Sequence, residues 1–345
     1  MGKSEIKAYF LTLSVTERSE LVRELQDMVG AKATEGILEV RREMLDNKQG
    51  ACPHCGHTKY VRFGKKSGSQ RYKCKSCGRS FTEYSGTWMA GIHHKDKIEG
   101  YLRLMVEEKS LDRIKESLSI NKKTAFDWRH KILASLSDTD KGDFVGITES
   151  DETFFLRSEK GRNVVDRKPR KRGGTSKSRG ISEDQVAVVV TQDRRSGMDL
   201  TVATLGRLKK VDIENAIGDR ISPGQVVLCS DAHVSYKGFA IDKKLEHHAL
   251  KAVIKQRVKN KVYHIQHVNS THNRLKKWLD NAFWGVSTKY LQQYLNWYRI
   301  KESLKGSAQF AKDFSLRTTG DIQVGSKFGR IQQQYENLII NTNLN

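Results

Sequence analysis

Apolar residues follow two different spacings along the chain. Up to about residue 137 they recur at helical intervals, as in Leu21, Val22 and Leu25, which follow the capping-box sequence of residues 14–17. A second helix is expected from Thr34 to Met44. From residue 143 onward, short apolar runs typical of strands alternate with helical stretches. The pattern predicts a helical N-terminal region followed by an α/β domain.

The second half of the chain has the element order of a ribonuclease-H-like core. Three strands in a meander are followed by a helix and a fourth strand, and then by further helices and a short apolar stretch. In such a core, a mixed sheet flanked by helices, the first and fourth strands lie side by side. The expected strands are Phe144–Phe155, Val186–Thr191, Met198–Thr204, Val226–Leu228 and the stretch His248–Ile254; the expected helices are Leu208–Ile217, Tyr236–Leu245, Val268–Leu279 and Thr288–Tyr298.

Two aspartates occupy positions at which this fold would bring carboxylates together. Asp231 directly follows the fourth strand, where α/β sheets carry their active sites, although it could instead cap the next helix. Asp151 lies within the first strand, where a charge is costly unless it is paired or bound to a metal. A third polar ligand is expected on the helix after the last strand, where Asn269 and Lys276 share one face two turns apart.

The charge of the chain points to a polyanionic partner. With 345 residues it can form two or three domains, and its net charge of +22 favours nucleic acid, although a ribosomal or merely basic surface remains an alternative. No apolar run approaches the roughly 18 residues of a membrane span, and no secretion signal is evident. We expect no membrane partner and a cytoplasmic, nucleoid-associated location.

Four of the five cysteines form two C-x-x-C pairs separated by 18 residues. Cys52, Cys55, Cys74 and Cys77 suit tetrahedral Zn²⁺, and a site closed by four thiolates is structural rather than catalytic. Basic and aromatic residues interleave between the pairs, which suits a zinc ribbon laid against a DNA backbone; a solvated basic hairpin is the alternative. The candidate DNA contacts here are Lys59, Arg62, Lys65, Lys66 and Arg71.

Two further segments are candidate DNA contacts. A short helix, a turn at residues 119–121 and a basic second helix make a helix-turn-helix pattern, although amphipathic helix pairs are common. Residues 157–180 carry ten basic residues among Gly and Ser, and this insertion is expected to be disordered without DNA. The candidate contacts are Asn121, Lys122, Lys123 and Arg129 in the second helix, and Arg170, Lys171 and Arg172 in the insertion.

Motifs, element order and composition shifts along the chain together divide it into five expected segments. They are a helical N-terminal region (1–48), a zinc ribbon (49–92), a helix-turn-helix region (93–137), a ribonuclease-H-like catalytic domain (143–305) with the basic insertion 157–180, and a polar C-terminal tail (306–345).

From about residue 50 to 305 the chain resembles insertion-sequence transposases of the Merlin-related group, which join a zinc ribbon to a DDE-type catalytic domain. The resemblance rests on the four cysteines, Ser150–Thr153, Cys229–Ala232, Gln266–Lys276 and Gly285–Trp297. It implies catalytic roles for Asp151, Asp231, Asn269 and Lys276, with Asn269 at the usual position of a glutamate. Asparagine in place of glutamate removes one negative charge from the set of metal ligands. It leaves open whether Asn269 ligates the metal directly and whether Glu149, Glu152 or His267 contributes.

The implied chemistry is metal-dependent transfer at phosphorus. Hard oxygen ligands on Asp151, Asp231 and Asn269 suit Mg²⁺ or Mn²⁺, and Lys276 would position the DNA end. The expected partners are double-stranded DNA, as terminal inverted repeats and target, and further copies of the chain in a dimer or larger assembly. The alternatives are a DNA-binding regulator with an inert domain and a structure-selective nuclease without strand transfer.

Overall fold

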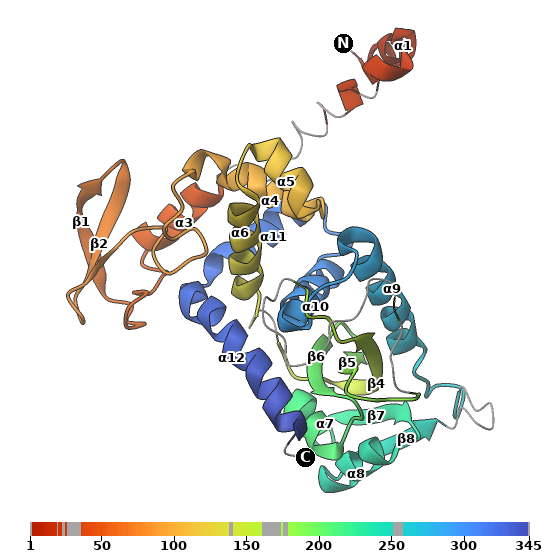
Figure 1. Ribbon diagram of the computed structural model, residues 1–345. Helices are drawn as coiled ribbons and strands as arrows, with labels where there is room; N and C mark the ends of the chain where they lie inside the picture. The colour runs from red at the N-terminus through yellow and green to blue at the C-terminus, as the bar shows by residue number, and fades with distance from the viewer. Residues whose placement is uncertain are drawn as a thin grey trace. The chain divides into compact units, whose positions relative to one another are not determined.

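The computed structural model describes residues 2–18, 20–22, 25, 36–137, 141–160, 174, 179–250 and 258–343. Within it the chain forms two compact units, Met1–Asp127 with Gly306–Ile322, and Trp128–Lys305 with Gln323–Asn345. Figure 1 labels the helices and strands. The candidate contacts Arg170, Lys171 and Arg172, and with them most of the basic insertion, lie outside the described residues.

The first unit contains a small three-stranded sheet and short helices. The sheet has the order β1-β2-β3, and both pairings are antiparallel. The aromatic rings of Tyr60, Tyr72 and Phe81 pack together, with ring centres 5.3–5.7 Å apart. They form the core of this sheet. The capping box at Ser14 is formed, because its hydroxyl accepts from the amide of Glu17 at 3.3 Å. The elements are α1 (Lys3–Thr12), α3 (Ile37–Asp46), β1 (Tyr60–Lys66), β2 (Ser69–Cys74), β3 (Ser80–Phe81), η1 (Lys95–Lys97), α4 (Ile98–Val106), α5 (Leu111–Leu118) and α11 (Phe310–Gly320).

The second unit is built on a five-stranded mixed sheet of order β6-β5-β4-β7-β8. The pairings among β6, β5 and β4 are antiparallel, whereas β4, β7 and β8 run parallel. This is the ribonuclease-H-like arrangement, and the predicted fold class is confirmed. The strands are β4 (Gly146–Leu156), β5 (Gln185–Asp193), β6 (Met198–Leu205), β7 (Val226–Asp231) and β8 (Glu246–Leu250).

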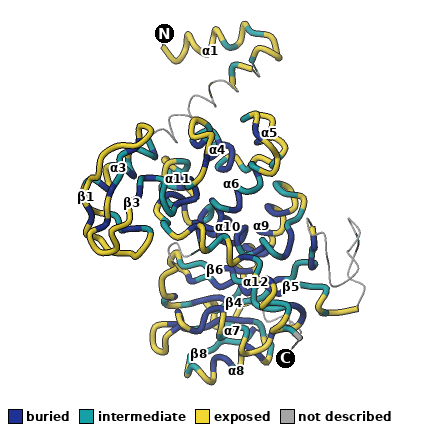
Figure 2. Tube along the Cα trace, turned by 60° about the vertical axis from the view of Figure 1, so that its left-hand side comes forward, coloured by how far each residue is buried: buried dark blue, intermediate teal, exposed yellow. Residues whose placement is uncertain are grey.

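Helices cover both faces of this sheet (Figures 1 and 2). On one face Tyr236 and Phe239 of α8 and Ile213 of α7 pack against Leu228 of β7 in a buried apolar cluster. On the other face α9 contacts β4 and β5, and α10 contacts β6. The helices are α7 (Lys210–Ile217), η2 (Gly218–Arg220), α8 (Val234–Asp242), α9 (Gln266–Phe283), α10 (Thr288–Ser303) and α12 (Val324–Asn343).

The polar segment after residue 305, where no element is expected from the sequence, forms two helices. In the second unit, α12 contacts β6 and α10 and buries Ile331 and Tyr335. Helix α6 (Lys122–Ser135) spans the division between the units at residues 127 and 128. Among the described residues, none of the helices combines the length and apolar character that crossing a membrane requires.

Candidate active site

Two aspartates meet where β4 and β7 run side by side. The parallel register pairs Glu149 of β4 with Cys229 of β7. Two residues further along each strand, Asp151 comes level with Asp231, although 80 positions separate them in the sequence (231 − 151). Ligand oxygens of Asp151, Glu152 and Asp231 all lie within 4.8 Å of one another. The strand order therefore brings the two aspartates together, and adds Glu152 to them.

Two of the three carboxylates, Asp151 and Glu152, have raised pKa values. Burial raises the pKa of Asp151 to about 8, and the neighbouring charges of Glu152 and Asp231 add to the effect. Burial, followed by the charge of Asp231, also raises the pKa of Glu152. One oxygen of Glu152, Oε2, is buried without a hydrogen-bond partner. Within the described part of the chain, no salt bridge to a Lys or Arg offsets this concentration of negative charge.

A divalent cation fits this group of side chains. Carboxylate oxygens without thiolates are the donor set of Mg²⁺ or Mn²⁺, and a cation would offset the burial and the neighbouring negative charges that raise the pKa of Asp151. Asp151 and Asp231 are the residues that would hold it, with Glu152 within reach. Their metal-binding role stays a prediction.

Asp231 is not the N-cap of the helix that follows it. Its Oδ1 accepts a hydrogen bond from the backbone N–H of His233 at 3.0 Å, which closes a tight turn after β7. The N-cap of α8 is His233, whose ring nitrogen accepts from the N–H of Ser235 at 3.3 Å. The helix-capping alternative for Asp231 is therefore wrong, and the turn leaves its other oxygen available to the carboxylate group.

Glu149 ties helix α9 to the strand that carries Asp151. This fully buried carboxylate accepts backbone N–H bonds from His267 at 3.0 Å and Val268 at 3.3 Å. It also contacts the Nδ1 of His267 at 2.7 Å. A carboxylate at a helix N-terminus satisfies amides that have no partner within the helix and complements the helix dipole. Glu149 thus fixes the first turn of α9 two residues before Asp151.

The ring of His264 completes a second cluster with Glu149 and His267. The three residues offer ligand atoms within 4.8 Å of one another, as a metal site would. Arg194 also lies 3.5 Å from the carboxylate and supplies a positive charge to it. Because the helix cap and Arg194 already account for these contacts, we assign this cluster to the positioning of α9.

His272 is the residue of α9 that contacts the strand of Asp151. Its side chain is 7% exposed, and its ring hydrogen-bonds the backbone carbonyl of Asp151. Burial, helped by the charge of Lys276, lowers its pKa to about 4, so the imidazole is neutral near pH 7. Its Nε2 is buried without a partner. The sequence held a signal for this residue, because His272 lies at helical spacing between Val268 and Leu275 on the buried stripe.

Asn269 and Lys276 lie on the exposed side of α9, before and after His272. The seven-residue spacing places both along one edge of the helix, as expected. Lys276 lines a cavity formed with the end of β4. The ligand role of Asn269 and the DNA-positioning role of Lys276 stay predictions.

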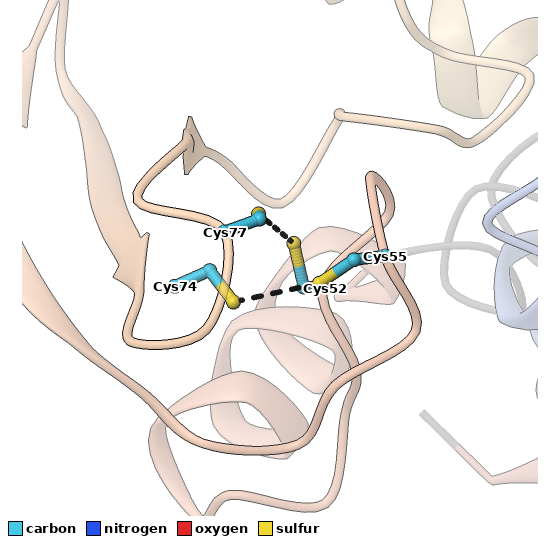
Figure 3. Close-up of side chains that lie close together, drawn as sticks. All are labelled: Cys52, Cys55, Cys74 and Cys77. Carbon is cyan, nitrogen blue, oxygen red and sulfur yellow. Dashed lines mark hydrogen bonds between the residues drawn. The ribbon is translucent and has the colours of Figure 1, made fainter.

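The four cysteines converge between two turns of the small sheet (Figure 3). The sulfurs of Cys52 and Cys77 are 3.7 Å apart, as are those of Cys55 and Cys74. With Zn–S bonds of about 2.3 Å, tetrahedral geometry requires a separation of about 3.8 Å. Backbone N–H groups, first that of Cys77, help to lower the pKa of Cys74 to about 7. This is a zinc-binding cysteine cluster of the structural type.

The basic residues of the ribbon lie mostly on its exposed side. Lys59, Lys65 and Lys66 are exposed, whereas the Arg62 guanidinium forms a 2.7 Å ion pair with Asp46. The half-buried Arg71 places its guanidinium 4.9 Å from the ring centre of the exposed Phe63. Positive charge beside an exposed ring suits a nucleic-acid surface, and the DNA contacts stay predictions.

Helices α5 and α6 follow one another across a short turn, as expected, and their assignment as a helix-turn-helix stays a prediction. Ser119 adopts the left-handed conformation that ends α5, with φ 48°, and Asn121 begins α6 by accepting the amide of Lys123 at 2.8 Å. The side chains of Lys122 and Lys123 are exposed, and pair with Asp112 and Asp127 at 2.8 and 2.7 Å. Asn121 thus caps the helix, Lys122 and Lys123 remain exposed to solvent, and their DNA contacts stay predictions.

The prediction that Arg129 contacts DNA is corrected. Arg129 is only 2% exposed, and its guanidinium lies 5.7 and 5.8 Å from the ring centres of Phe283 and Trp297. Residue 129 lies two turns into α6, on the side of the helix that faces the core of the second unit. Helix spacing alone did not indicate that this arginine is buried.

Sheet order and clustered carboxylates together define a class of domain, the ribonuclease-H-like α/β domains with carboxylates on neighbouring strands. Residues 143–299 match the model of a family described as the ISXO2-like transposase domain. This part of the chain is thus similar to DDE-type transposase domains, and a transposition function is supported at the level of the family.

A curated relative is the "Uncharacterized protein in transposable element ISH50" of Halobacterium salinarum. It is 29% identical over 158 residues, which are 42% of this chain and 50% of the relative, so the match spans half of the relative's length. Two solved structures, a pre-cleavage Mos1 transpososome and the Mos1 strand transfer complex, are each 13% identical and cover 64% of this chain and 78% of their own. Their TM-scores are 0.18 and 0.20, so the fold assignment rests on the chain's own sheet order.

Proposed function

We propose that this protein is a DNA transposase that binds the inverted-repeat ends of an insertion sequence and catalyses metal-dependent strand cleavage and strand transfer. The observation that carries the proposal is the convergence of Asp151, Glu152 and Asp231 at one edge of a ribonuclease-H-like sheet. The family match over residues 143–299 supports the class of reaction. The net charge of +22 supports DNA as the substrate.

Asp151 and Asp231 would hold the catalytic Mg²⁺ or Mn²⁺, and Asn269 is the proposed third ligand. When bound, a pair of such ions activates water or a 3′ hydroxyl and stabilises the leaving oxygen in an in-line displacement at phosphorus. Lys276 would bind a phosphate of the DNA end and keep it in line with the carboxylates. Glu149 and His272 hold α9, and with it Asn269 and Lys276, against β4.

Recognition of the element's ends is assigned to the first unit. Structural zinc would hold the turns of the ribbon, and Lys59, Lys65 and Lys66 would contact the phosphate backbone. In the helix-turn-helix, Lys122 and Lys123 would exchange their partners Asp112 and Asp127 for phosphates. A dimer or larger assembly would hold two ends together, and light scattering of the protein–DNA complex tests for it; a strictly monomeric complex would count against this part of the proposal.

The test compares wild type with Asp231→Asn on supercoiled plasmid that carries the element's ends, in Mg²⁺ or Mn²⁺. Asp231→Asn keeps the turn oxygen but removes the charge, so cleavage should fall by more than the roughly 10- to 100-fold that loss of an outer-shell partner costs. The matched control is Asp242→Asn, an exposed aspartate on α8 that pairs with Lys210. Binding of Mn²⁺, followed by electron paramagnetic resonance, should weaken only in Asp231→Asn.

Three other outcomes would each reject the proposal. Equal cleavage by wild type and Asp231→Asn would mean that the carboxylates are not the site. DNA binding without any cleavage would favour a regulator with an inert domain. Hydrolysis of a pre-cut donor end that is never joined to target DNA would favour a nuclease without strand transfer.

A further inference from the structure

A cavity of about 730 Å³ lies between the end of β4, helix α9 and the start of α10. Its lining includes Phe155, Lys160, Lys276, Leu279 and Trp284. The volume falls within the range of about 300–1,000 Å³ that is usual for small-ligand sites. Apart from Lys276, its lining residues have no role in the proposed metal site or in the proposed recognition of the DNA ends.

The cavity adjoins the carboxylates along two routes. Phe154, another lining residue, is three positions after Asp151 on β4, which is about 10 Å of strand. Lys276 is four positions after His272, whose ring bonds the carbonyl of Asp151; four positions are about 6 Å of helix. A spacing of about 10 Å corresponds to roughly three base-pair steps of a DNA strand. Nucleotides next to the scissile phosphate therefore come within reach of the cavity.

Trp284 borders the cavity in an unusual backbone conformation. It ends α9 in the left-handed region, with φ 55° and ψ 41°, and its side chain is 75% exposed. A bulky residue is disfavoured in this conformation, which glycine adopts at little cost at helix ends. The next residue is Gly285, a type that adopts the left-handed conformation without strain. An exposed tryptophan kept at a disfavoured position indicates a function for the ring.

The charges around the cavity favour a base inside it and phosphates at its rim. Leu279 and Leu291 are 2% and 4% exposed and provide an apolar wall. Lys160 and Lys276 are exposed at the edge. Glu159 already pairs with Arg157 at 2.9 Å, and Asp280 is the remaining carboxylate of the lining. An apolar wall beside an aromatic ring, with cations outside, suits a flat uncharged ring on a charged backbone.

We propose that this cavity binds an unpaired nucleobase of the DNA strand under reaction, stacked on the indole of Trp284, with Lys276 and Lys160 on the adjoining phosphates. The proposal rests on the proposed transposase function, because it requires DNA at the carboxylates. It adds a site for a single flipped or frayed base, about three nucleotides or fewer from the scissile phosphate.

The test uses two DNA probes with the full-length protein. One is a blunt duplex, and the other is the same duplex with a three-nucleotide single-stranded 3′ overhang that contains 2-aminopurine. Stacking on Trp284 should quench the 2-aminopurine fluorescence and make the overhang probe bind more tightly than the blunt one. Loss of one base–aromatic stack corresponds to roughly 5- to 150-fold weaker binding.

Trp284→Gly separates this role from folding. Glycine suits the left-handed conformation, so the variant should melt at the same or a higher temperature while the quench and the overhang preference disappear. Trp284→Phe should retain part of both. Lys276→Ala should weaken both probes, and the matched control Lys277→Ala, an exposed neighbour outside the cavity lining, should leave the quench and the preference unchanged.

The outcomes distinguish this inference from the proposed function. If wild type binds both probes equally without a quench, or if Trp284→Gly keeps the quench, the base site is rejected while the transposase proposal stands. If neither probe binds at all, the proposed function itself is rejected, and the base site with it.

Discussion

At the scale of single residues, the carboxylate of Asp151 makes stability depend on pH. Burial and the charges of Glu152 and Asp231 raise its pKa to about 8 in the folded protein, above the ordinary value of 3.8. Between these two pH values the folded state binds more protons than the unfolded state, so stability falls as pH rises. For one such group, the free energy of unfolding falls by on the order of 1 kcal/mol per pH unit.

We therefore expect the melting temperature of the metal-free protein to fall relative to that of Asp151→Asn as pH is raised from about 4 to about 8, because a carboxylate with a raised pKa must ionise in a buried site. The comparison is made with the variant because His272, whose pKa is lowered to about 4, contributes a slope of the opposite sign up to about pH 6.5 in both proteins. Differential scanning calorimetry in a chelating buffer measures this, and millimolar Mg²⁺ should flatten the upper part of the curve. Asp151→Asn should reduce the slope, while Asp143→Asn, outside the group, should keep it. A difference in melting temperature between the metal-free wild type and Asp151→Asn that stays constant across this window would contradict the assignment.

Glu149 provides a second prediction for a single side chain. Replacing it by Gln removes the charge that caps α9 and contacts His267 and Arg194, so we expect a loss of about 1–3 kcal/mol. Urea unfolding of Glu149→Gln measures the loss. The control is Glu246→Gln, whose exposed carboxylate contacts His248 at 2.8 Å and should change stability little. Equal stability of both variants would show that the cap contributes nothing.

The sequence predicted part of the site and missed another part for a physical reason. Asp151 and Asp231 could be paired because adjacent parallel strands fix which positions come level. Glu152 was left as an open alternative, because strand alternation directs neighbouring side chains to opposite faces. The structure brings both Asp151 and Glu152 within reach of Asp231, the last residue of β7. His272 was missed because a histidine on an apolar stripe looks like an ordinary core residue.

At the scale of elements, the cysteine cluster predicts one structural zinc ion per chain. Cys55→Ser should lose it, measured by mass spectrometry of the protein's metal content, because three thiolates no longer close the tetrahedron. Cys229→Ser, a change at the buried cysteine of β7, is the matched control and should retain the zinc. Zinc retained in both variants would mean that other ligands hold it.

Helix α12 predicts a stabilising role for the C-terminal segment. The hydroxyl of Tyr335 donates to Glu159 at 2.7 Å, next to the ion pair that Glu159 forms with Arg157. Tyr335→Phe removes one hydrogen-bond donor from this buried carboxylate. The free energy of unfolding, measured with a chemical denaturant, should fall by about 1–3 kcal/mol. Tyr263→Phe, at a ring that stacks on His248 outside this network, should cost less. An unchanged midpoint for Tyr335→Phe would count against the contact.

The elements that sequence patterns predicted well are those with strong local periodicity. Strands β4 to β7 and the helices α7, α8 and α9 fall within a few residues of their expected bounds. Of the stretch His248–Ile254, the first three residues lie in β8 and residues 251–254 lie outside the described residues. Helices α11 and α12 were missed, because few of their residues are apolar and their packing depends on distant elements such as β6. Helical structure supported by tertiary contacts leaves little trace in a local pattern.

At the scale of the whole molecule, the charge of +22 predicts DNA binding that depends steeply on salt. If six to ten phosphates are neutralised, affinity should fall by about 10³- to 10⁵-fold between 50 and 200 mM salt. Fluorescence anisotropy with a labelled duplex measures the slope. Changing Lys65 and Lys66 to Ala should reduce the magnitude of the slope of log affinity against log salt concentration by about one for each lysine lost. An affinity insensitive to salt would show that the basic surface is not the binding surface.

The parallel register of β4 and β7 restricts where the chain can tolerate insertions and deletions. Inserting or deleting one residue within β4 between Gly146 and Asp151 would move Asp151 out of level with Asp231 and turn its side chain to the opposite face of the sheet. The same change in residues 157–180 leaves both strands in register. Among natural or engineered length variants, active copies should therefore differ in that connection and keep the spacing of β4 constant.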